Sequence, residues 1–94
     1  MTLRITQAVE ADLPDLLALY RHLSPADPPP DPDQAMAAFR RFHLYVGSAI
    51  LLGRVQDHAV TTGTLIVVPN LTRQVQPYAL IENVVTLAAF RHQG

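Results

Sequence analysis

The sequence of 94 residues contains no cysteine and no lysine, and the absence of cysteine limits what the protein can do. Without cysteine there is no disulfide, no thiolate metal site and no cysteine nucleophile. All seven basic residues are arginine, and eight acidic residues bring the formal net charge to −1. A non-specific nucleic-acid binder needs a basic face, so we expect no nucleic-acid partner. We interpret the lack of lysine as a genomic bias, in a protein of bacterial origin.

Long apolar runs and an N-terminal signal pattern are also missing. No run approaches the roughly 18 apolar residues of a membrane-spanning helix. The start, MTLRITQAVEADL, lacks the basic-then-apolar order of a secretion signal. The four histidines lack metal-ligand spacing and are interpreted as surface or packing residues: His22, His43, His58 and His92. With 49% hydrophobic residues a packed core is feasible. We expect a cytoplasmic protein with no membrane partner and no metal.

The first half of the chain predicts one strand and two helices. Residues 3–9 largely alternate apolar and polar side chains, which is typical of a half-buried strand. Asp12 is placed to cap a helix, which the proline-rich stretch 24–32 ends because proline lacks the amide donor. Asp33 then caps a second helix, which directs Met36, Phe39 and either Phe42 or His43 inward. The inward stripe of the first helix is Leu13, Leu16, Leu17, Tyr20 and Leu23.

From residue 44 onward the pattern predicts strands. The expected strands are a short one at 44–46, a hairpin of 48–55 and 60–68 around a turn at 56–58, and a last strand from Tyr78 to about Thr86. Gly63 inside the second hairpin strand suggests a bulge or a close backbone approach.

The later strands carry unbroken apolar runs, such as Ile50-Leu51-Leu52 and residues 65–68. Neighbouring residues of a strand point to opposite faces, so these runs need cover on both sides of the sheet. Two amphipathic helices cover only one side. We expect the other side to be covered by further sequence of the same protein or by another chain, as in an obligate oligomer.

At the last strand the sequence resembles a known family. The segment TGTLIVVPNLTRQVQPYALIENVVTLAAFRHQG looks like the central part of a GNAT-type N-acetyltransferase, and the preceding strand, capped helix, loop and second helix also match. The resemblance covers the chain from Leu3 to Gly94. It implies an α+β fold, the three-layer sandwich of the acyl-CoA N-acyltransferases, with the order β-α-α-β-β-β. Residues 1–94 would be the N-terminal part of a single domain, truncated before the coenzyme-binding helix.

The resemblance also implies a site for acetyl-CoA. The backbones of Val84, Val85 and Thr86 would pair with the peptide-like pantetheine arm, and one of their amides would donate to the thioester oxygen. Four residues match the first half of the turn that holds the pyrophosphate: Arg91, His92, Gln93 and Gly94. Two alternatives stay open at this point. Val84 and Val85 would also suit core packing, and Arg91 would suit an ordinary solvated position.

Glu82 is the one acidic residue inside an otherwise apolar strand. Some members of the family use a glutamate of the fourth strand as the base that accepts the amine proton, so the resemblance implies this role for Glu82. The alternative is a carboxylate that faces the cleft, or forms a salt bridge, without doing chemistry. Asn83 is expected on the opposite face in a structural role, and Tyr20 in the core. The proline-rich loop shapes the acceptor site or is only a stiff connector.

Two functions are consistent with these residues. The first is an N-acetyltransferase that moves an acetyl group from acetyl-CoA to the amine of a small molecule or peptide by direct attack. This chain alone would then be poorly active and would form a homo-oligomer. The alternative is a non-catalytic fragment, or a regulatory or interaction module, that self-associates.

Overall fold

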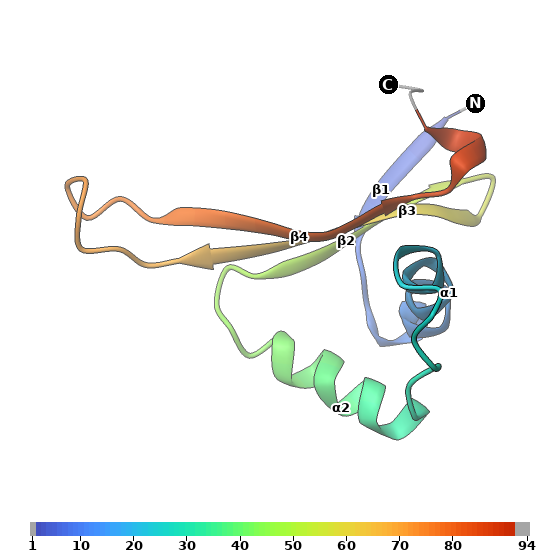
Figure 1. Ribbon diagram of the computed structural model, residues 1–94. Coiled ribbons are helices and arrows are strands. Elements are labelled where there is room, and N and C mark those ends of the chain that lie inside the picture. The colour runs from blue at the N-terminus through green and yellow to red at the C-terminus, as the bar shows by residue number, and fades with distance from the viewer. Residues whose placement is uncertain (1, 92–94) are drawn as a thin grey trace.

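The computed structural model describes residues 2–91, which form one antiparallel sheet with two helices (Figure 1). The strands are β1 (Leu3–Gln7), β2 (Ala49–Val55), β3 (His58–Val68) and β4 (Tyr78–Thr86), and they lie in the order β1-β2-β3-β4. The helices are α1 (Leu13–Leu23) and α2 (Pro32–Phe42), with short 3-10 helices η1 (Glu10–Asp12) and η2 (Ala88–Phe90). The predicted fold class and the order β-α-α-β-β-β are confirmed.

Asp12 stands directly before α1, as predicted, but its carboxylate does not cap that helix. It accepts a hydrogen bond from the amide of Val9 at 2.9 Å instead. This bond closes the tight turn of η1, which carries the chain from β1 into α1. Asp12 therefore holds the chain in the turn before α1, through the Val9 amide, and does not bond to an amide of the helix itself.

The cap of α2 lies two residues earlier than the sequence pattern indicates. Asp31 accepts a hydrogen bond from the amide of Gln34 at 3.0 Å, and Pro32 is the first helical residue. Proline suits this position because its fixed φ is helical and its missing amide would have no helical partner there. The prediction that Asp33 caps α2 is therefore wrong, and Asp33 lies in the first turn.

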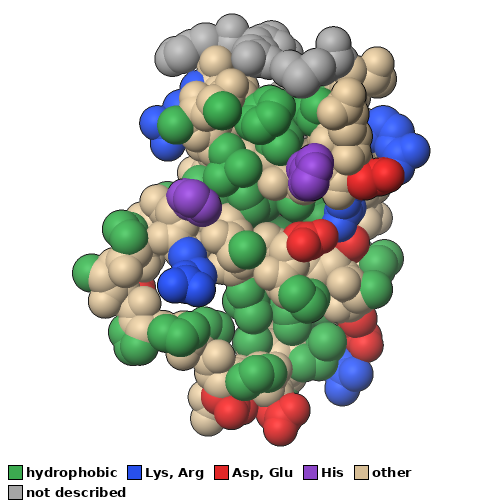
Figure 2. Space-filling view, turned by 90° about the vertical axis from the view of Figure 1, so that its right-hand side faces the viewer, with side chains coloured by type: hydrophobic (Ala, Val, Ile, Leu, Met, Phe, Trp, Pro, Cys, Tyr) green, Lys and Arg blue, Asp and Glu red, His purple; other side chains and the backbone are tan. Residues whose placement is uncertain are grey.

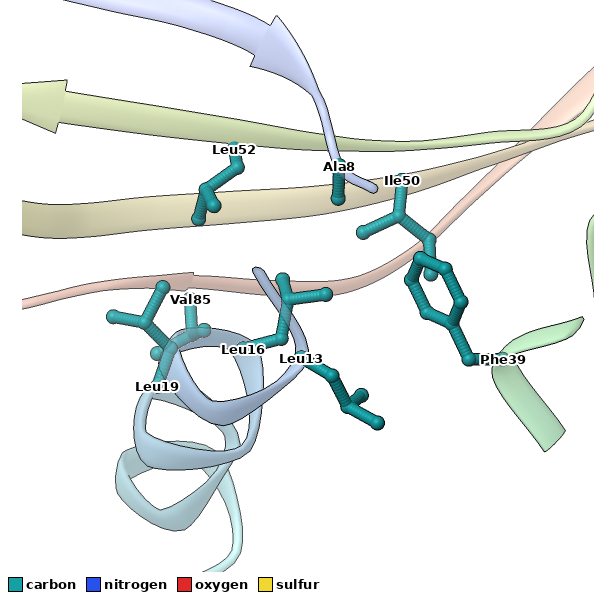
Figure 3. Packing of buried hydrophobic residues seen from close by; sticks show 8 residues of the cluster. All are labelled: Ala8, Leu13, Leu16, Leu19, Phe39, Ile50, Leu52 and Val85. Atoms are coloured by element: carbon teal, nitrogen blue, oxygen red, sulfur yellow. The ribbon is translucent and has the colours of Figure 1, made fainter. Parts of the chain in front are cut away.

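The core lies between α1, α2 and one face of the sheet. The buried cluster in Figure 3 consists of Ala8, Leu13, Leu16, Leu19, Phe39, Ile50, Leu52 and Val85. The close-up shows Leu16 and Leu19 of α1 directed toward the strands, with Phe39 reaching in from α2. One inward residue was misassigned from the sequence: Leu19 is 2% exposed, whereas Leu23 is 44% exposed because the helix ends there.

Residues 44–46 do not form the short strand that was expected. They lie in turns, and all three side chains are exposed. β2 begins to pair with β3 only at Ala49, so residues 44–46 have no strand with which to pair. Gly47, at φ +83°, turns the chain toward the sheet. The predicted hairpin turn is confirmed at Gln56 and Asp57, whose φ values of +50° and +68° suit a two-residue turn between antiparallel strands.

The other face of the sheet is bare among the described residues. Both helices lie on one side in Figure 1, with the long β3–β4 hairpin projecting beyond them. On the opposite side Ile5 is 62% exposed, Ile81 71% and Val84 57%. The expectation that the helices cover only one face is confirmed.

Candidate functional site

The most unusual feature of β4 is a bulge in its middle. Thr62 pairs with Val85 and Thr64 pairs with Glu82, so that the single residue Gly63 of β3 faces Asn83 and Val84 of β4. Gly63 marks the position of the bulge, as predicted, but the extra residue belongs to the partner strand. Bulges redirect side chains and are frequent next to active sites.

The bulge depends on the backbone of Asn83. Its φ is +51°, in the left-handed region that asparagine adopts more readily than most residues. This distortion brings Glu82 and Asn83 to the same cavity. Asn83 was expected on the opposite face, and that expectation is wrong because the strict alternation of a strand fails at a bulge. An asparagine inside an apolar strand was the sequence signal for this conformation.

Glu82 and Asn83 form the polar wall of a cavity of about 480 Å³ between the helices and the sheet. Its other walls come from α1, α2, β2, β3 and the end of the proline-rich loop. The side chains used below are Tyr20 of α1, Ala38 and Phe42 of α2, and Ile66 of β3. A volume of this size suits a small organic ligand.

The carboxylate of Glu82 has no hydrogen-bond or ion-pair partner among residues 2–91. Its side chain is exposed, which overturns the assumption that an apolar strand buries it. The salt-bridge alternative is not supported within the described residues, and an unpaired carboxylate at a cavity remains. Such a group can accept a proton from a ligand or hold a cation.

The outer edge of β4 is free among the described strands. The amide of Leu87 donates to the carbonyl of Val60 at 2.9 Å. Residues of an antiparallel ladder alternate between bonding their partner strand and pointing away from it. Thr86 therefore directs its backbone groups to the free side, whereas Val84 lies in the bulge, where this alternation does not hold. Val85 faces β3, and its side chain is buried in the core.

Arg91 lies beside this edge. Its Nε donates to the carbonyl of Thr86 at 3.0 Å, which fastens the end of η2 to β4 and agrees with an outward-facing Thr86 carbonyl. The guanidinium is exposed and provides a positive charge next to the free edge. The other predicted residues of this turn, His92, Gln93 and Gly94, lie outside the described residues.

The proline-rich loop lines a second hollow of about 320 Å³. This hollow shares Leu17, Tyr20, Pro30 and Asn83 with the cavity at Glu82. Of the two interpretations of the loop, the contacts favour the one in which it shapes a site. Tyr20 packs against the core, as expected, and also lines both hollows.

An ionic frame holds the helices in position. Arg54 of β2 donates to Asp12 and to Asp15 at 2.9 Å each, and so joins the sheet to the start of α1. The Val9 amide, followed by Arg54, holds the pKa of Asp12 below its usual value despite partial burial. On the surface, Arg40 of α2 forms two hydrogen bonds with Glu10 and lowers its pKa. These carboxylates are engaged in structure, unlike Glu82.

Other kinds of site find little support in residues 2–91. This part of the chain contains no group of three or more potential metal-ligating side chains. None of its helices is long and apolar enough to cross a membrane. On the face seen in Figure 2, charges of both signs lie among hydrophobic side chains, without a broad basic patch.

Similarity to solved structures identifies the fold. No protein-family model and no curated protein matches the sequence. A protein provisionally named an acetyltransferase, from Agrobacterium tumefaciens, is 45% identical over 100% of this chain, with a TM-score of 0.87. The chain has the fold of the GNAT-type acetyltransferases. It spans 64% of the length of the Agrobacterium structure.

Two more distant structures share the GNAT fold. Glucosamine-6-phosphate N-acetyltransferase from Arabidopsis thaliana is 18% identical with a TM-score of 0.85, over 98% of this chain and 65% of its own length. An aminoglycoside 6'-N-acetyltransferase from Acinetobacter baumannii is 22% identical with a TM-score of 0.76, over 99% of this chain and 63% of its own length. At these identities the likeness concerns the fold alone.

Proposed function

We propose that residues 1–94 are the N-terminal part of an acetyl-CoA-dependent N-acetyltransferase domain. Its acceptor is the amine of a small molecule or peptide, which attacks directly while both substrates are bound. The fold family, the 45% identity to the Agrobacterium protein and the absence of a membrane-spanning helix from the described residues support this proposal. A cytoplasmic location in a bacterium is part of it.

The observation that carries the proposal is the bulge of β4. It gives one short segment two different surfaces: the carboxylate of Glu82 at a cavity and the free backbone edge at Val84 and Thr86. Acyl transfer needs an acceptor and a donor within reach of each other, together with a group that accepts a proton. A strand with a cavity on one face and an open edge can bring these together.

Glu82 accepts the proton of the attacking amine, directly or through a water molecule. The amine nitrogen forms a bond to the acetyl carbonyl carbon while the carbon–sulfur bond breaks. The electron pair of that bond leaves on the sulfur. Neither an ion pair nor a hydrogen bond from residues 2–91 occupies the Glu82 carboxylate, which leaves it available for this transfer.

The edge of β4 fits the peptide-like arm of acetyl-CoA, which supplies the activated acetyl group. Thr86 offers outward-facing backbone groups and Val84 lies at the bulge of the same free edge, and an exposed edge recruits an extended chain through such groups. Val85 is better suited to the core than to a coenzyme contact. Arg91 offers charge for the pyrophosphate, together with His92, Gln93 and Gly94, whose part in the site is carried only by the sequence resemblance.

The complete protein encoded by the gene provides the test. It should bind acetyl-CoA, release free coenzyme thiol in the presence of an amine, and lose turnover by about 10²- to 10⁴-fold in Glu82→Gln. The acid limb of its pH–rate profile should disappear in that variant. Asp57→Asn is the matched control, because it makes the same chemical change at the hairpin turn. A Glu82→Gln enzyme with a profile of unchanged shape would return Glu82 to a structural role.

A second candidate function is a non-catalytic module that self-associates. The exposed Ile5, Ile81 and Val84 on the bare face favour it, because apolar side chains exposed on one face of a sheet suit an interaction surface. Absence of acetyl-CoA binding by the complete protein, together with concentration-dependent assembly, would support this function instead.

A further inference from the structure

We propose that the acceptor is a monoamine with an apolar body, aliphatic or aromatic, which enters the cavity at Glu82 with its ammonium group toward the carboxylate. This inference rests on the proposed acetyltransferase function and names the acceptor for that same site. Glu82 is the one charged side chain among the described residues that line the cavity. The remaining lining is mostly aliphatic and aromatic.

The charge of the cavity lining disfavours two other kinds of acceptor, phosphorylated amines and polycationic amines. A phosphorylated amine needs a cation for its phosphate, and no arginine or histidine lines this cavity within the described residues. The nearest candidate, Arg21, lines the neighbouring hollow together with Asp27. A polycationic amine needs several carboxylates to bind its positive charges, whereas Glu82 is the one carboxylate among the described residues that line this cavity. A single positive charge matches the single negative one.

The shape and chemistry of the walls favour an apolar body. Tyr20, Phe42 and Ile66 come from three different elements and face the same volume. Burial of an apolar group against such walls contributes about 25 cal/mol for each Å² removed from water. The walls of the cavity therefore favour an acceptor whose body is apolar.

The acceptor class is tested by measuring how well the complete protein acetylates three different amines. The probes are 2-phenylethylamine, glucosamine 6-phosphate and kanamycin, each with saturating acetyl-CoA. We expect kcat/KM for 2-phenylethylamine to exceed both others by at least about tenfold, the factor given by a modest difference in apolar burial. Arg21→Gln should leave this preference unchanged.

A charge placed in the cavity sharpens the test. Ala38 is an exposed residue of α2 that lines the cavity, so Ala38→Asp adds a second carboxylate without a buried substitution. We expect Ala38→Asp to raise KM for 2-phenylethylamine about tenfold. The ratio of kcat/KM for 2-phenylethylamine to kcat/KM for kanamycin should become smaller. Ala37→Asp is the control, because Ala37 is exposed on the same helix and does not line the cavity. It should change KM by less than about twofold.

The outcomes separate the acceptor class from the function itself. Acetylation of all three amines with a preference for glucosamine 6-phosphate or kanamycin would overturn the acceptor class and leave the acetyltransferase function standing. An equal effect of Ala37→Asp and Ala38→Asp would also overturn it. Absence of both acetyl-CoA binding and acetylation would overturn the proposed function, and the acceptor class with it.

Discussion

The two faces of the sheet are built from the same kinds of residue and have opposite surroundings. Leu52 of β2, on the helix-covered face, is fully buried, whereas Ile81 of β4, on the bare face, is 71% exposed. Both lie in apolar runs whose local sequence is equally suited to a core. The difference arises because α1 and α2 lie on the same side. The surroundings of a strand residue therefore depend on how many helices the chain provides and where they pack.

β4 has side chains that the helices bury on one face and side chains that stay exposed on the other. This difference explains why the candidate site lies on β4. Val85 is held in the core and anchors the strand, while Val84 lies on the bare face. The bulge between Val85 and Glu82 lets the strand keep its anchor and still turn Glu82 and Asn83 to the cavity. A regular strand would send one of these two side chains to the opposite face.

The largest expected loss of stability comes from a substitution on the helix-covered face. Leu16 is fully buried, so Leu16→Ala should reduce the free energy of unfolding by about 3 to 5 kcal/mol, through lost burial and an internal cavity. Ile81→Ala removes the same number of carbon atoms, but from a side chain that is 71% exposed, and should reduce the free energy of unfolding by less than about 1 kcal/mol. Urea unfolding of the 94-residue chain at one fixed protein concentration measures both. Similar losses in the two variants would mean that the bare face is buried in solution.

A smaller effect is expected on assembly. If the bare face associates, Ile81→Glu should weaken self-association of the 94-residue chain by about tenfold or more, because a carboxylate would be buried in the interface. Leu71→Glu is the control, since Leu71 is 91% exposed in the β3–β4 loop. Sedimentation at micromolar concentration gives the result. A monomeric unsubstituted chain would contradict the prediction of self-association.

The fold could be predicted from the sequence because most of its signals are local. Proline at 28–30 and 32 separates two helical stripes, and the apolar runs after residue 48 indicate strands. The errors lie where a tertiary effect overrides the pattern. Asp33 looked like a cap, but Pro32 suits the first helical position better. Residues 44–46 have the composition of a strand and lack a neighbour to pair with.

The candidate site could be predicted in part. Glu82 attracts attention as a charge in an apolar strand, and the structure brings it to a cavity. The position of Asn83 could not be derived from alternation, because a bulge changes the facing of the residues around it. The cavity itself is formed by segments far apart in the chain, from Tyr20 to Asn83. Its apolar walls could therefore not be predicted from any single segment of the sequence.

The smallest expected effect concerns the ionic frame of the covered face, which has no counterpart on the bare face among residues 2–91. Asp12→Ala removes the hydrogen bonds to the Val9 amide and Arg54 and should reduce the free energy of unfolding by about 1 to 2 kcal/mol near pH 6. Because the pKa of Asp12 is lowered in the folded state, its stabilisation is present above the unfolded value of about 3.9 and is lost as the pH falls through the folded value. Urea unfolding of both chains from pH 6 to pH 2.5 should show the difference between them shrinking in acid. A difference independent of pH would assign the role of Asp12 to packing, and its charge would then contribute nothing to the junction of β1 and α1.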